Sequence, residues 1–91
     1  MTAHFDEFEE EMTSRSLERA YDYVDEHRIG GLEEVSVGLF HAEVHGSELY
    51  DVDIRLRDND IVFASCTCPY DHDGYCKHIG AVLLTLRDYK H

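Results

Sequence analysis

The sequence predicts an α+β fold, with an N-terminal helix, a three-stranded antiparallel meander, a metal-binding loop and a C-terminal helix packed on the sheet. Its 91 residues suffice for one small domain but not for two. Apolar residues recur every three or four positions in the first part of the chain, at every second position in the middle, and every three or four positions again in the last part. This pattern predicts a helix, then strands, then a helix. All three cysteines fall within residues 66–76, so the loop that holds them lies between the last strand and the last helix.

Both helices are predicted from apolar residues that recur at intervals of three and four. The first is capped by Thr13 or Ser14, ends before Gly30, and has an apolar face made of Leu17, Ala20, Tyr21 and Val24. The second spans residues 77–89, with an apolar face made of Ile79, Val82, Leu83 and Leu86. We expect this second face to cover the sheet.

The strands are predicted from the alternation of apolar and polar residues after Leu32. The apolar positions are odd-numbered as far as Leu39 and even-numbered from Phe40, which indicates a bulge or bend within one strand. A second strand over residues 50–57 alternates apolar with charged side chains, so one of its faces is buried and the other charged. A turn then leads into a third strand over residues 61–66.

The chain carries 8 basic and 20 acidic residues, and its formal net charge is −12. We expect residues 1–12 to be an acidic N-terminal tail, which is either solvated or uses Phe5 and Phe8 as anchors for a partner. Residues 13–91 then form the single domain. An acidic surface with few lysines is typical of proteins that work in concentrated salt, which predicts a halophilic source. The alternative is an ordinary acidic protein with a basic partner.

Several functional classes lack their usual signals in this sequence. No apolar run approaches the ~20 residues of a membrane span, and the N-terminus lacks the layout of a secretory signal. We therefore expect a cytoplasmic protein without a membrane partner. The sequence contains no glycine-rich phosphate loop, hydrolase nucleophile elbow or Ser/His/Asp arrangement, so we expect neither an enzyme nor a small-molecule substrate.

The metal motif spans residues 66–78 and consists of Cys66, Cys68, Cys76 and His78. Residues two apart on a strand face the same way, so the first two sulfurs can reach one ion. Cys76 is expected just before the last helix and His78 in its first turn. Three cysteines and one histidine form a closed tetrahedral set for Zn²⁺ with no open position, which predicts one structural zinc ion. The alternative is three buried or free thiols beside a surface histidine.

This motif, C-x-C followed by a variable loop and C-x-H, resembles the SWIM-type zinc finger. The resemblance rests on residues 65–70 and 76–84, and it extends upstream through Arg19, Tyr23, Arg28, Ile29 and residues 42–47 and 50–52. It covers about residues 14–87 in all.

The resemblance implies that the four motif residues bind zinc, and that Lys77 fills a position where the family often has a basic residue. Family members occur in transposases, helicase-like ATPases and recombination proteins, and the finger is thought to bind DNA or other proteins. This chain looks like a small stand-alone member from a prokaryote, with a haloarchaeal source expected from its composition.

Two functions remain open at this point. The first is an interaction module or adaptor for a protein partner, which the acidic balance favours. The second is nucleic-acid binding, with a role in transcription, recombination or repair, through a patch made of Arg55, Arg57, Lys77, Tyr70 and Tyr75. In the structural alternative to this patch, the two arginines only pair with Asp51 and Asp53, and the tyrosines cover the metal site.

Overall fold

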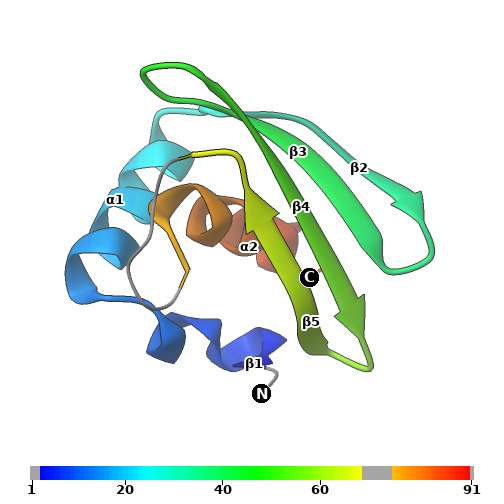
Figure 1. Ribbon diagram of the computed structural model, residues 1–91. Coiled ribbons are helices and arrows are strands. Elements are labelled where there is room, and N and C mark those ends of the chain that lie inside the picture. The colour runs from blue at the N-terminus through cyan, green and yellow to red at the C-terminus, as the bar shows by residue number, and fades with distance from the viewer. Residues whose placement is uncertain (1–2, 69–74, 91) are drawn as a thin grey trace.

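A computed structural model describes residues 3–68 and 75–90, with side chains over 7–68 and 75–88 (Figure 1). Its elements in chain order are β1 (Ala3–His4), the 3-10 helix η1 (Phe5–Glu11), α1 (Ser14–Asp25), β2 (Ile29–Ser36), β3 (Leu39–His45), β4 (Leu49–Arg57), β5 (Asp60–Cys66) and α2 (Lys77–Lys90). No helix in these ranges is long and apolar enough to cross a membrane. The α+β class predicted from the sequence is confirmed.

The sheet has the strand order β1-β5-β4-β3-β2, and every neighbouring pair is antiparallel. Strands β2 to β5 form a meander, to which the two-residue β1 adds at the β5 edge. The prediction of three strands was therefore wrong. The first predicted strand is in fact two strands, β2 and β3, joined by a tight turn.

The turn between β2 and β3 lies where the apolar residues change from odd to even positions. Ser36 pairs with Leu39, so only two residues form the turn. The even apolar positions after it are buried in β3, whereas Val35 and Val37 before and within the turn are exposed. Gly38 has φ +77°, and a Cβ there would lie 2.5 Å from the carbonyl oxygen of Leu56. A glycine is required at this position because both the backbone conformation and the space exclude a side chain.

Helix α2 is the centre of the fold. It contacts α1, η1 and strands β2 to β5 (Figure 1). Most of its side chains over residues 77–88 are consequently buried, namely His78, Ile79, Ala81, Val82, Leu83, Leu84 and Leu86. At the crossing with α1, a Cβ on Gly80 would lie 3.2 Å from the Cβ of Ala20, so the absence of a side chain allows the two helices to approach closely. The expected packing of α2 on the sheet is confirmed.

The segment before α1 contributes to the core. Phe8 is fully buried, and the Arg87 guanidinium carbon lies 5.2 Å from the centre of its ring. Arg87 also forms an ion pair of 2.6 Å with Glu9. The hypothesis that Phe8 anchors a partner is therefore wrong, because its ring is inside this protein. The side chain of Phe5 lies outside the described residues.

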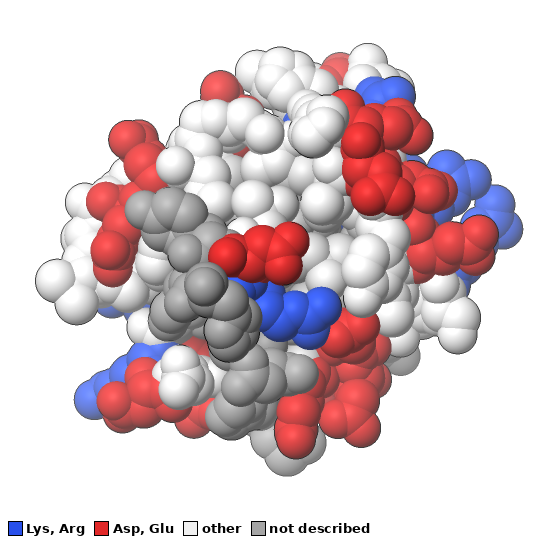
Figure 2. All heavy atoms as spheres, turned by 180° about the vertical axis from the view of Figure 1, so that it is seen from behind, with Lys and Arg blue, Asp and Glu red and all other residues white. Residues whose placement is uncertain are grey.

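Acidic side chains predominate on the rear surface of the molecule. In the view from behind, they cover more area than basic side chains, which form small separate groups beside them (Figure 2). This distribution is consistent with the net charge of −12.

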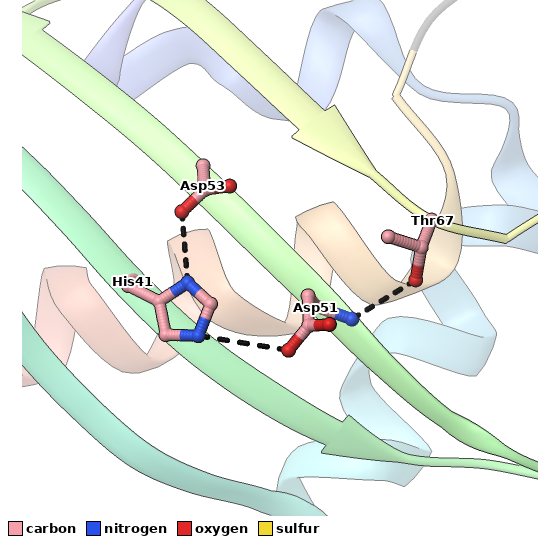
Figure 3. Close-up of polar contacts among 4 residues, drawn as sticks. All are labelled: His41, Asp51, Asp53 and Thr67. Carbon is pink, nitrogen blue, oxygen red and sulfur yellow. Dashed lines mark hydrogen bonds and ion pairs between the residues drawn. The ribbon is translucent and has the colours of Figure 1, made fainter.

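The outer face of the sheet, which is turned away from α2, carries a histidine between two carboxylates (Figure 3). The Nδ1 of His41 lies 2.8 Å from Asp53 Oδ1, and its Nε2 lies 3.6 Å from Asp51 Oδ1. The hydrogen bond to Asp53, supported by the charges of Asp53, Asp51 and Glu43, raises the pKa of His41. Asp51 is also held through its backbone N–H, which donates to Thr67 Oγ1 at 3.0 Å.

The raised pKa of His41 predicts a pH dependence of stability. The folded protein binds the His41 proton more tightly than the unfolded chain does. Protonated His41 therefore contributes its full share to the free energy of unfolding below the unfolded-state pKa of about 6.5. This contribution is lost as the pH rises through the higher folded-state pKa. His41→Gln should remove this part of the pH dependence, at a cost below about 1 kcal/mol because the ion pairs are exposed. Urea unfolding of the natural chain and of the variant, with saturating zinc at about pH 6 and about pH 9, measures how the free energy of unfolding changes with pH. The same change with pH in both proteins would contradict the prediction.

Candidate metal centre

The structure brings together all four residues of the metal motif. Cys66 ends β5, Cys68 follows it, Cys76 directly precedes α2 and His78 lies in the first turn of α2. One possible ligand atom from each residue lies within 4.8 Å of the others. Cys76 and His78 are buried, whereas Cys66 and Cys68 are partly exposed. Two segments that are separate in the sequence therefore meet at one point.

The local backbone explains how each side chain reaches this point. Cys66 pairs with Val52, whose side chain is fully buried, so the sulfur of Cys66 points to the inner face of the sheet. The sulfur of Cys76 accepts the backbone N–H of Ile79 at 3.5 Å. It thus takes the place that a capping oxygen usually has at a helix N-terminus. The positive end of the helix dipole favours a thiolate there.

The distances between the ligand atoms fit a zinc ion. The Nδ1 of His78 lies 3.6 Å from Cys66 Sγ and 3.9 Å from Cys76 Sγ. Around tetrahedral zinc, bonds of about 2.3 Å to sulfur and about 2.0 Å to nitrogen separate the ligand atoms by roughly 3.5 to 3.8 Å. His78, Cys66 and Cys76 are therefore already close to the spacing that zinc requires, and the ligand atom of Cys68 lies within 4.8 Å of the others.

The electrostatics of the thiols also favour a cation. Hydrogen bonding by the Cys66 thiol, and next by His78, lowers the pKa of Cys76 to about 4, although burial opposes this shift. The pKa of Cys66 is raised, first because it donates to Cys76 and second because it is desolvated. A stabilised thiolate among buried thiols is the state that zinc binds, and zinc itself displaces the remaining thiol protons.

Two tyrosines hold the ring of His78. The Tyr50 ring lies 4.3 Å from it, centre to centre, at an interplanar angle of 31°. The Tyr23 ring from α1 lies 5.4 Å away and meets it edge to face at 68°. The Nε2 of His78 is buried and has no hydrogen-bond partner among the described residues. With Nδ1 turned toward the sulfurs, this arrangement fixes which nitrogen is available to a metal.

Gly46 lies against both tyrosines. We call Tyr23, Tyr50 and Gly46 the aromatic clamp of His78. A Cβ on Gly46 would lie 2.9 Å from Tyr23 Oη, 3.0 Å from Tyr50 Cε2 and 3.5 Å from His78 Nε2. A glycine therefore leaves the space into which the three rings pack. Sequence reasoning assigned no role to these residues at the metal site, because no spacing relates them to the cysteine motif.

The proposed nucleic-acid patch is not assembled as one surface. Lys77 lies at the start of α2, with its Nζ 5.7 Å from the centre of the Tyr23 ring. Arg55 and Arg57 lie on the outer face near the other end of β4, roughly 17 Å and 24 Å from Tyr50 along the strand. Tyr75 is partly buried against the core, and burial raises its pKa. Tyr70 lies outside the described residues.

The fold and the site define a class of protein, a small α+β domain with a Cys₃His zinc finger. The family model for the SWIM zinc finger matches residues 50–87, so this part of the chain is a SWIM zinc finger. The match begins at Tyr50 and ends in α2, and Tyr23 and Gly46 lie outside it. Comparison with curated proteins and with solved structures gave no match.

Zinc removal should unfold the whole domain and not only the loop. The site holds the N-terminus of α2, and α2 contacts both α1 and the sheet. Zinc binding contributes about 10 to 16 kcal/mol in finger peptides, which matches or exceeds the ~5 to 15 kcal/mol that usually separates folded from unfolded states. Chelation, or Cys76→Ser, should therefore abolish the dispersed amide spectrum. Native amide shifts from Ile79 to Leu86 in zinc-free protein would contradict a structural metal.

The aromatic clamp should matter for zinc affinity. Gly46→Ala forces Tyr23 and Tyr50 away from His78, and groups that orient a ligand typically change affinity by about 10- to 100-fold. Competition with a chromophoric chelator measures the affinity, and the cobalt-substituted spectrum reports the ligand geometry. Gly30→Ala is the matched control, because its Cβ would meet only His45 Nε2, at an ordinary 3.6 Å. Equal zinc affinities of both variants would show that the clamp is only packing.

Proposed function

We propose that this chain is a non-catalytic interaction module, in which a structural zinc ion holds a docking surface for a protein partner. The observation that supports a structural role is the donor set. Three sulfurs and one ring nitrogen lie together, and such a set fills all four positions of tetrahedral zinc. A catalytic zinc would need an open position for water or substrate.

The docking surface that we propose is a recess beside the metal centre. Its volume is about 410 Å³, and it is lined by Arg19, Asp22, Tyr23, Glu26, Arg28, Gly46 and Ser47. Two of these residues belong to the aromatic clamp around His78. Loss of zinc would free His78 and with it the contact between α1 and the turn after β3. The shape of the recess would then depend on the metal.

The charges of this recess favour a protein partner over a phosphate backbone. Arg28 is paired with Glu26 at 2.6 Å and donates to the carbonyl oxygen of His45 at 3.0 Å. The side chain of Arg19 is exposed and has no hydrogen bond or ion pair within the described part of the chain, so it is available to a partner. Asp22 and Glu26 would repel phosphates, whereas a polar protein segment can match both signs.

One observation favours the second function, nucleic-acid binding. The Arg28 guanidinium carbon lies 5.3 Å from the centre of the Tyr23 ring, and Lys77 approaches the same ring. With Arg19, this arrangement gathers three cations near one aromatic side chain. The net charge of −12 opposes such binding at low salt.

A photocrosslinker at Asp22, which is exposed in the recess, tests the proposal in an extract of the source cells. We expect an adduct that protease degrades, that nuclease leaves intact and that chelation of zinc abolishes. The same crosslinker at the exposed Asp88 is the control. An adduct degraded by nuclease would favour the second function. Equal yields at both positions, or none at either, would contradict docking at the recess.

A further inference from the structure

The outer face of the sheet is uncovered and carries exposed apolar side chains. In Figure 1 the four long strands lie in front of α2, and no described element lies in front of them. Among the described residues, six large apolar side chains are exposed, and all except Tyr21 belong to the strands or their turns: Val35, Val37, Leu49, Val62 and Phe63. Phe63, half exposed, is paired across the strands with Arg55.

The charges that β4 places on this face are divided into two halves, and the neighbouring strands add Glu43 beside Asp51 and Asp60 beside Arg57. On β4, Asp51 and Asp53 lie in the half toward Leu49, whereas Arg55 and Arg57 lie in the half toward the β5 turn. Both aspartates contact His41. Over residues 7–68 and 75–88, neither arginine side chain has a hydrogen bond or ion pair, so the arginines do not pair with the aspartates.

We propose that this outer face is a dimer interface between two copies of the chain. The two-fold axis runs between the two stacked sheets, perpendicular to β4 and level with Ile54. Rotation about it reverses the direction of β4 in the second copy. It places Arg55 opposite the second copy's Asp53, and Arg57 opposite its Asp51. Because the axis repeats each contact, the face is complementary to itself.

The neighbouring strand extends this match. On β5, Phe63 lies beside Arg55 and Ser65 beside Asp53. The same axis therefore sets Phe63 against the second copy's Ser65. The aromatic ring meets a small side chain, and two sheets can pack at their usual separation of about 10 Å.

The size and net charge of the protein determine how tight the dimer is. Four strands of about seven residues cover roughly 450 Å² of each copy, which is at the weak end of specific interfaces. The charge of −12 on each copy adds long-range repulsion. Salt screens this repulsion over a Debye length of about 10 Å at 0.1 M, whereas the facing charges are closer together. Dimerisation should therefore strengthen as salt is first raised from a low concentration.

Charge-swap variants of the zinc-loaded chain test the proposal. Arg55→Asp/Arg57→Asp makes all four β4 positions acidic, and Asp51→Arg/Asp53→Arg makes them all basic. By sedimentation equilibrium from about 1 µM to about 1 mM, the natural chain should dimerise and each variant alone should dimerise at least roughly tenfold more weakly. An equimolar mixture of the two variants should form a heterodimer, because opposite charges then face each other throughout.

Matched controls separate this effect from a change in net charge. Arg15→Asp/Arg19→Asp and Glu18→Arg/Asp25→Arg make the same charge changes on exposed positions of α1 and should leave dimerisation intact. Zinc content verifies that each variant is folded, and Phe63→Ser tests the interface without a charge change. A natural chain that remains monomeric at every concentration and salt would overturn the proposal. So would a mixture of the two variants that forms no heterodimer.

Discussion

The structure depends on His78, which belongs to the metal centre and to the core at once. Its Nδ1 faces two cysteine sulfurs, while its ring packs against Tyr50 from the sheet and Tyr23 from α1. A metal bound there would hold together the end of β5, the start of α2 and, through the rings, the first helix. A core of this size contributes little stability by packing alone, so such a cross-link has a large effect.

This arrangement explains why the metal site extends beyond the segment that matches the SWIM zinc finger. Residues 50–87 supply the four metal-binding side chains, Tyr50 and most of α2. Tyr23 and Gly46, which precede that segment, close the remaining side of the histidine. The recess proposed as a docking surface uses the same two residues. Metal binding and the shape of that surface are then physically linked.

The two proposed surfaces lie on different sides of the molecule and differ in charge pattern. The recess beside the metal mixes both signs over a short distance, which suits a polar protein segment. The outer face of the sheet separates the signs into two halves along β4, which suits a second copy rotated by two-fold symmetry. Interaction through one surface leaves the other open. A dimeric module would present two zinc fingers to its partners.

The sequence by itself determined the α+β class, the two helices and the four metal-site residues, because these follow from local periods and short spacings. It misjudged β2 and β3 as one strand, because a parity change is produced equally by a bulge and by a two-residue turn. Only the tertiary structure decided that Phe8 is buried, that Lys77 lies apart from Arg55 and Arg57, and that Tyr23 reaches His78. These contacts join residues distant in the chain, and local sequence patterns carry no information about which distant residues pack together.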